Sequence, residues 1–116
     1  MLAKNNRLRL KKEYDQVFKK GQRYSSPFFN LVIHHLVDSK NRFGIIISTN
    51  ISKKATVRNL LKRRIRAIIK KHLSEFKDGF DIVIIAKISS VLLSYSELEQ
   101  ELVSLFYKSH ILKNKE

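Results

Sequence analysis

The feature that most constrains this chain is a stretch of twenty residues, 53–72, that carries nine basic side chains and no acidic one. Its apolar residues recur every three or four positions, which predicts a long amphipathic helix with one face built for a core. Arg58, Lys62 and Arg66 follow one another at intervals of four, and like charges at this spacing destabilise a helix by roughly 0.2–0.5 kcal/mol per pair. A sequence that tolerates this repulsion favours a polyanion bound to the cationic face over a face that is merely solvated.

The rest of the composition supports the same interpretation. The 116 residues carry 24 Lys and Arg against 10 Asp and Glu, and residues 1–72 hold 19 of those bases and three of those acids. The length fits a single domain over 1–116, and no apolar run approaches the roughly 20 residues that a membrane helix needs. The absence of cysteine excludes a disulfide scaffold, a zinc ribbon and a thiol nucleophile. We therefore expect one cytoplasmic, nucleic-acid-binding domain with no membrane partner.

Hydrophobic periodicity and turn residues predict three helices and three strands. The helices are expected over 10–20 and 55–76 and onward from a capping box at 94–97, and the strands over 28–37, 43–48 and 80–86. A polar turn at 38–41 predicts a hairpin between the first two strands. The strand–helix–strand unit over 43–86 predicts a parallel pair, for which the general rule favours a right-handed crossover. We expect the helices to pack mainly on one face of the sheet and the last few residues to be frayed.

Side chains suited to catalysis or metal binding do not cluster in the sequence. Gly21, Gly44 and Gly79 are isolated, so no glycine loop is available to hold a phosphate. His34 and His35 are adjacent in a predicted strand and point to opposite faces, so they cannot bind one metal ion together. The sequence therefore predicts neither a catalytic residue nor a metal site in the chain itself.

The predicted phosphate-binding face combines two rows of side chains on the long helix. Arginine suits paired phosphate oxygens because its planar fork donates two parallel hydrogen bonds, and Asn59 can both donate and accept. Such a helix could also dock in a DNA groove, although the flanking strands fit no usual DNA-reading module well. The residues predicted to bind nucleic acid are Lys53, Lys54, Arg58, Asn59, Lys62, Arg63, Arg66 and Lys70.

Four segments of the chain follow the order of a known family pattern. Ala55, Arg58-Asn59, Lys62-Arg63 and Arg66 match an Ala-x-x-Arg-Asn-Arg-x-x-Lys-Arg-x-x-Arg type helix, with Leu60 in place of the second arginine. The other matches are Arg7-Leu8 with Tyr14 and Phe18, the strand 79–86 and the helix start 93–98. Together these segments resemble the protein subunit of bacterial ribonuclease P over almost the whole chain. Thr49-Asn50 stand where that family often has a basic pair, for which Lys53 and Lys54 can compensate.

The resemblance implies a fold and a division of labour. The implied fold is α+β, an α/β sandwich of the ribosomal-protein-S5-domain-2-like type. It has a mixed sheet of about four strands, three helices and a left-handed crossover through the basic helix, opposite to the general rule. The implied catalytic centre belongs to a large RNA, with Mg²⁺ held mainly by that RNA and the substrate. The implied holoenzyme is an endoribonuclease that removes the 5′ leader of precursor tRNA, with this chain as a monomeric protein subunit.

The resemblance and the aromatic spacing together predict a leader-binding cleft between the first helix and the sheet. Tyr14 and Phe18 lie one helical turn apart, so they can offer a platform on which unpaired bases stack, although core packing also explains such residues. Phe28 and Asn30, at alternate positions of the first predicted strand, are expected to line the same cleft. A general RNA chaperone or a ribosomal-protein-like module would explain the charge equally well, but not the ordered downstream matches.

Overall fold

Four strands and three helices make up the regular structure of residues 2–36 and 40–113, which are the residues that the computed structural model describes. The helices are α1 (Lys11–Lys20), α2 (Ala55–Lys71) and α3 (Tyr95–Lys108), and the strands are β1 (Gln22–Ser25), β2 (Phe29–His35), β3 (Arg42–Ile46) and β4 (Phe80–Ala86). Short 3₁₀ turns lie at η1 (Lys4–Asn6), η2 (Leu73–Glu75) and η3 (Ile88–Leu92). This confirms the expected α+β class with three helices and a four-stranded sheet.

The strands form one mixed sheet in the order β1-β2-β4-β3. Strand β4 is antiparallel to β2 and parallel to β3, so the predicted parallel pair is confirmed. The predicted hairpin between the first two strands is wrong, because the almost wholly apolar β4 lies between them and is buried on both faces. Val37 and the first residues of the predicted turn at 38–41 lie outside the described residues. The left-handed sense of the β3–α2–β4 crossover connection remains a prediction that rests on the family resemblance.

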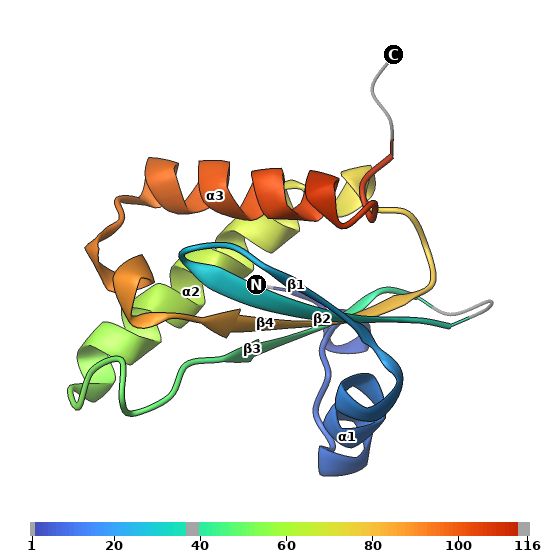
Figure 1. Ribbon diagram of the computed structural model, residues 1–116, viewed down its shortest axis with the longest axis horizontal. Helices are drawn as coiled ribbons and strands as arrows, with labels where there is room; N and C mark the ends of the chain where they lie inside the picture. The colour runs from blue at the N-terminus through green and yellow to red at the C-terminus, as the bar shows by residue number, and fades with distance from the viewer. Residues whose placement is uncertain (1, 37–39, 114–116) are drawn as a thin grey trace.

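The two faces of the sheet carry different helices. Figure 1 shows α2 and α3 on one side of the sheet and α1 on the other, which confirms helices mainly on one face. Alternation along β2 serves both sides, because Leu31 and Ile33 join the core under α2 and α3, whereas Val32 faces α1. We call the smaller cluster under α1 the α1 core; its buried members are Leu8, Val17, Val32 and Val83.

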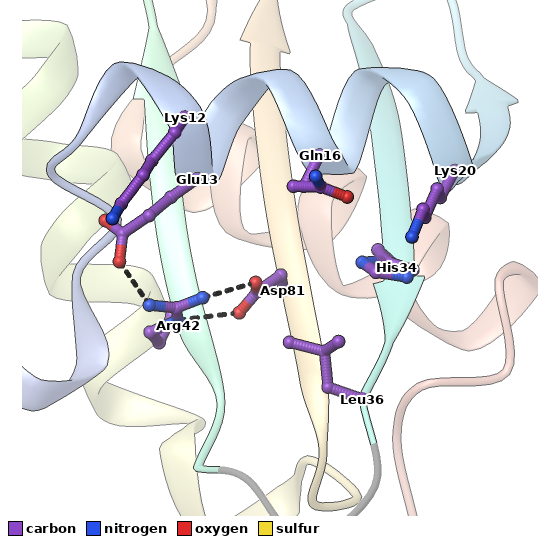
Figure 2. Close-up of a pocket in the computed structure, with 8 residues that line it drawn as sticks. All are labelled: Lys12, Glu13, Gln16, Lys20, His34, Leu36, Arg42 and Asp81. Carbon is purple, nitrogen blue, oxygen red and sulfur yellow. Dashed lines mark hydrogen bonds and ion pairs between the residues drawn. The ribbon is translucent and has the colours of Figure 1, made fainter.

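A charged network holds α1 on the sheet (Figure 2). One oxygen of the Glu13 carboxylate accepts hydrogen bonds from the backbone N–H groups of Arg9 and Leu10, at 2.9 and 2.8 Å. These bonds cap the start of α1, because the N-cap residue Leu10 has no polar side chain that could do so. The other oxygen pairs with Arg42. Arg42 also donates two hydrogen bonds, of 2.9 and 2.7 Å, to the almost fully buried carboxylate of Asp81. The network therefore ties α1 to β3 and β4.

These hydrogen bonds also make the anchor sensitive to acid. The backbone N–H groups of Leu10 and Arg9, helped by Arg42, lower the pKa of the Glu13 carboxyl below its usual value. A carboxyl with a lowered pKa in the folded state stabilises the fold above its unfolded pKa. That contribution is lost as the pH falls through the folded value.

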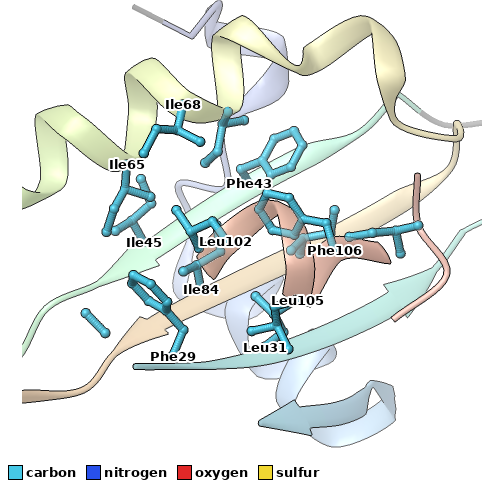
Figure 3. Packing of buried hydrophobic residues seen from close by; sticks show 14 of the residues in the cluster. Phe29, Leu31, Phe43, Ile45, Ile65, Ile68, Ile84, Leu102, Leu105 and Phe106 are labelled. Carbon is cyan, nitrogen blue, oxygen red and sulfur yellow. The ribbon is translucent and has the colours of Figure 1, made fainter. Parts of the chain in front are cut away.

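The larger core, under α2 and α3, is built from aromatic and branched aliphatic side chains (Figure 3). Phe76 is its hub, with edge-to-face contacts to Phe43 and Phe106 at ring-centroid distances of 5.1 and 5.0 Å. Phe76 was predicted on the long helix, but α2 ends at Lys71 and the chain then turns through η2. The ring of His72 holds this turn, because it lies 2.6 Å from the Glu75 carboxylate.

Replacing Asp81 by asparagine tests the anchor of α1. We expect Asp81→Asn to lower the free energy of unfolding by about 2–4 kcal/mol, because it leaves the partly buried Arg42 guanidinium with one carboxylate instead of two. Urea unfolding followed by circular dichroism measures this change. Asp15→Asn, the same substitution at an exposed position of α1, is the control and should change the value by less than about 0.5 kcal/mol. Equal losses in the two variants would contradict the anchoring role.

Candidate nucleic-acid interface

Helix α2 presents the predicted cations on the side opposite to its core residues. Leu61, Ile65, Ile68 and Ile69 are buried, which fixes the orientation of the helix on the sheet. On the other arc a hollow of about 460 Å³ opens at the surface. Its lining residues are Thr56, Asn59, Lys62, Arg63 and Arg66. Four of these five residues were predicted from the sequence, and Thr56 could have been added because it lies one turn before Asn59 on the same arc.

The positive charges of this face have no carboxylate partners within residues 2–36 and 40–113. The ion pairs found there use Arg42, Lys71 and His72 as the basic partners. The predicted cations Lys53, Lys54, Arg58, Lys62, Arg63, Arg66 and Lys70 take part in none of them. The face is therefore left available for an external anion.

Arg58 differs from the other predicted cations because part of its guanidinium is already used. Its Nη1 donates a 2.7 Å hydrogen bond to the backbone carbonyl of Ser52, across the turn that leads into α2. Lys53 and Lys54 are exposed on the same turn. Arg58 therefore positions these two lysines beside the first turn of the helix and keeps its remaining donors for a ligand.

The carboxylates of the C-terminal third act elsewhere. Glu99 on α3 accepts from Lys71 at 2.9 Å and lies 2.8 Å from the ring of His72, both at the far end of α2. These two contacts lower the pKa of the Glu99 carboxyl. Glu99 thus fastens α3 to the end of α2 without covering the cationic arc.

The first aromatic residue of the predicted cleft, Tyr14, lies on α1, on the opposite face of the sheet from α2. Tyr14 is half-buried against the α1 core, and its ring lies over Gly44, where a Cβ atom would approach the ring to 2.5 Å. Burial raises the pKa of the Tyr14 hydroxyl, and the nearby positive charge of Arg66 opposes that rise. The charge of Arg66 is therefore near enough to Tyr14 to act on its hydroxyl electrostatically.

Phe18 and Asn30, two further residues of the predicted cleft, lie near β1. Phe18 is half-buried against the α1 core, and the guanidinium of Arg23 lies 5.7 Å from the centre of its ring. Asn30 hydrogen-bonds with Ser25 at 2.8 Å. Asn30 lines a pocket of about 260 Å³ together with Arg23, Tyr24, Ser25, Leu31 and Val32. The β1 residues were missed because this mostly exposed strand lacks the apolar alternation that marks a strand in a sequence.

Phe28 does not occupy the position expected for it. Strand β2 begins one residue later, at Phe29, because the hydroxyl of Ser26 accepts hydrogen bonds from the backbone N–H groups of both phenylalanines, at 3.2 and 3.0 Å. Phe28 is half-buried and packs against the larger core under α2 and α3. The alternation of β2 therefore begins at Phe29, so Phe28 lies with the larger core while Tyr14 and Phe18 pack on the α1 core.

Two further properties concern the described residues as a whole. Across 2–36 and 40–113, no three His, Asp or Glu side chains come together in a way that could hold a metal ion. Within the same ranges, no helix is both long and apolar enough to cross a lipid bilayer.

Comparison with known proteins decides the family. A family model described as "Ribonuclease P" matches residues 2–110. This chain belongs to the ribonuclease P family. A relative from Pseudanabaena sp., named "Ribonuclease P protein component", is 37% identical over 115 residues, which cover 97% of each chain. Membership in the ribonuclease P family confirms the resemblance seen in the basic helix and the downstream segments.

Solved structures of ribonuclease P proteins share the fold. The Staphylococcus aureus RNase P protein superposes with a TM-score of 0.87 at 22% identity, over 95% of this chain and all of that one. The Thermotoga maritima RNase P protein gives a TM-score of 0.80 at 27% identity, over 88% of this chain and 96% of that one. The mixed sheet with three helices is therefore the fold of ribonuclease P proteins. Its basic helix α2 suits association with the RNA of ribonuclease P.

The open cationic face predicts a strong dependence of RNA binding on salt. Four phosphate contacts, from Lys53, Arg58, Lys62 and Arg66, give an expected slope of log K against log salt near −3 (about −0.7 each). Arg66→Ala should bring the slope to about −2. It should also lower the affinity for RNAs of different sequence by about the same factor, because phosphate contacts carry little base information. Filter binding at several salt concentrations measures both. Lys108→Ala, which removes an exposed charge in the last turn of α3, should leave the slope unchanged.

The same unneutralised charge predicts that small anions stabilise the free protein. The formal net charge of +14 disfavours the compact state through self-repulsion, and an anion that binds only the folded chain adds stability by mass action. We expect the melting temperature at low ionic strength to rise when sulfate or phosphate is added. Chloride at matched ionic strength is the control for general screening. A melting temperature that sulfate and phosphate leave unchanged would contradict the prediction.

Proposed function

We propose that this chain is the protein subunit that binds the catalytic RNA of ribonuclease P and the 5′ leader of precursor tRNA. It thereby assists the endonucleolytic removal of the leader that gives the mature tRNA 5′ end. The observation that carries the proposal is the open cationic arc of α2, where Lys62, Arg63 and Arg66 line a surface hollow. The half-buried rings of Tyr14 and Phe18 on α1 supply the second surface. One surface suits structured RNA and the other suits an unpaired strand.

The cationic face of α2 is assigned to the catalytic RNA. Lys62, Arg63 and Arg66 line a hollow that is broad enough for a phosphate backbone and offers charged donors with Asn59 between them. Phosphate contacts fix the position and orientation of a protein on RNA without reading its sequence. Lys53, Lys54 and Lys70 extend the same role to the two ends of the helix.

The cleft beside α1 is assigned to the leader. Tyr14 and Phe18 keep part of their rings accessible while the remainder packs on the α1 core, so the rings are held rigidly. Stacking of an unpaired base on an aromatic side chain contributes about 1–3 kcal/mol and tolerates every base. Asn30 and Arg23 add polar contacts at the far end of the cleft. Such a cleft suits a subunit that must accept leaders of many sequences.

The proposed division of labour leaves the chemistry to the RNA. We propose that Mg²⁺ is held mainly by the RNA subunit and the substrate, where it supplies the metal-ion chemistry of phosphodiester hydrolysis. The chain's own residues bind and orient the leader and neutralise phosphates. Because only the precursor carries a leader, contacts in the cleft favour precursor over mature tRNA. One copy of the chain supplies both surfaces, which suits a monomeric subunit acting in the cytoplasm, where precursor tRNA is processed.

Reconstitution with the catalytic RNA tests the proposal. Adding the protein should raise cleavage of precursor tRNA at low magnesium concentration, and the complex should bind precursor tRNA more tightly than mature tRNA. Phe18→Leu keeps an apolar side chain on the α1 core but removes the aromatic face. It should therefore reduce the preference for precursor about 5- to 100-fold, the equivalent of about 1–3 kcal/mol.

The controls for this experiment separate leader binding from general effects. Tyr107→Leu removes an exposed aromatic ring from α3, away from the cleft, and should preserve the preference. Mature tRNA itself should bind equally well with the wild-type chain and with Phe18→Leu. Equal affinity of the wild-type complex for precursor and mature tRNA would rule out leader binding and favour a general RNA-binding module.

A further inference from the structure

A second groove lies on the other flank of α1 from the aromatic cleft. Val17 is fully buried on the sheet, so the side chains on either side of it along the helix circumference diverge. Tyr14 and Phe18 lie on one flank, while Gln16 and Lys20 lie on the other and extend toward the sheet in Figure 2. The groove has a volume of about 370 Å³ and is lined by Lys12, Glu13, Gln16, Lys20, His34, Leu36, Arg42 and Asp81.

Three neighbouring strands build the floor of this groove in register. His34 on β2 is the direct cross-strand partner of Asp81 on β4, and Asp81 is the partner of Arg42 on β3. All three side chains therefore project from the same face, toward α1. Arg42 is fully engaged by Asp81 and Glu13, so these three charges belong to the structural anchor and hold the floor rigid.

The remaining polar groups of the groove are uncommitted. The Nδ1 atom of His34 is buried and has no hydrogen-bond partner within the described residues. The amide of Gln16 and the ammonium groups of Lys12 and Lys20, which also line the groove, make no hydrogen bond or ion pair within the described residues. Because a buried polar atom without a partner is unfavourable, a ligand that brings a hydrogen bond to this ring would stabilise the groove.

We propose that this groove binds one unpaired nucleotide of an RNA strand. The base lies between Gln16 and His34, and the phosphates on its two sides contact Lys12 and Lys20. A glutamine amide presents a donor and an acceptor side by side, which is the pattern that reads a base edge. The two lysines are eight residues apart, about 12 Å along the helix, so they bracket the groove. A free phosphate would leave the amide, the imidazole and most of the volume unused.

This site is independent of the proposed leader cleft. The two lie on opposite flanks of α1 and share no lining residue. Phe18→Leu should therefore leave nucleotide binding in the groove unchanged, while a groove variant should leave stacking in the cleft intact. The experiments can therefore distinguish failure of the proposed leader binding from failure of the proposed nucleotide binding. The extruded bases of single-stranded loops and ends are the RNA elements that such a pocket suits.

Nuclear magnetic resonance titration of the free chain tests the site directly. The labelled protein is titrated with each of the four 5′-mononucleotides and, separately, with inorganic phosphate. We expect at least one nucleotide to shift the side-chain amide signals of Gln16 and the ring signals of His34 saturably. Gln16→Ala should weaken that binding at least fivefold (about 1 kcal/mol or more). The substitution is at an exposed helix position and favours the helix, so the fold is retained.

A matched pair of lysine variants tests the phosphate contacts. Lys20 lines the groove, whereas its neighbour Lys19 is exposed on α1 and does not. With a short single-stranded oligonucleotide, Lys20→Ala should make the salt slope shallower by about 0.7, and Lys19→Ala should not. Inorganic phosphate that reproduces the nucleotide shifts, or nucleotide binding that survives Gln16→Ala unchanged, would overturn the proposal.

Crosslinking in the reconstituted holoenzyme identifies which RNA supplies the nucleotide. The chain has no cysteine, so Asp15→Cys, at an exposed position beside Gln16, accepts a single photoreactive group. Crosslinks formed with the catalytic RNA alone assign the nucleotide to that RNA, and crosslinks that need precursor tRNA assign it to the substrate. Ser104→Cys on the exposed side of α3 is the control. Crosslinking at Asp15→Cys no stronger than at Ser104→Cys would contradict the site.

Discussion

The position of α1 depends on one guanidinium group. Arg42 joins a carboxylate of β4 to the carboxylate that caps α1, and the α1 core beneath the helix has only four buried members. A fully buried aliphatic side chain contributes about 1.5–3 kcal/mol, so Val17 and Leu8 alone hold this segment weakly. The charged anchor adds direction as well as stability, because a bidentate contact admits one orientation. Both flanks of α1, with the aromatic cleft on one side and the polar groove on the other, are placed by this contact.

A second constraint is the separation of charge within the chain. Glu13 and Asp81 form ion pairs with Arg42, and Glu99 forms one with Lys71 at the end of α2. These carboxylates therefore neutralise bases that have structural roles. The cations of the opposite arc of α2 have no such partner in the part of the chain that the structure describes. Their mutual repulsion is unfavourable in the free protein and is relieved when phosphates bind. The same arrangement therefore underlies both the expected stabilisation of the free protein by anions and the expected attraction for RNA.

Sequence periodicity predicted where the helices begin, but it did not predict which strands pair with each other in the sheet. The helix at 10–20, the basic helix beginning at Ala55 and the capping box at Ser94 are all present, because their signals lie within one or two turns of chain. Strand β1 was missed since its exposed residues show no alternation, and β4 separates two strands that were expected to pair. Strand pairing depends on contacts between distant segments, such as Asp81 with both His34 and Arg42, which no local pattern encodes.

The sequence by itself determined the cationic arc of α2, its opposing apolar arc and the aromatic pair on α1, because helical geometry converts spacing directly into faces. It also determined family membership through ordered motifs along the chain. Only the tertiary structure decided that the Tyr14 ring lies over Gly44, that Phe28 turns into the larger core and that His34 is left with a buried, unpaired nitrogen. These outcomes depend on which strand lies beside which and on the residue at which each strand begins. Both are settled by the packing of the whole sheet, through long-range contacts that a local stretch of sequence does not specify.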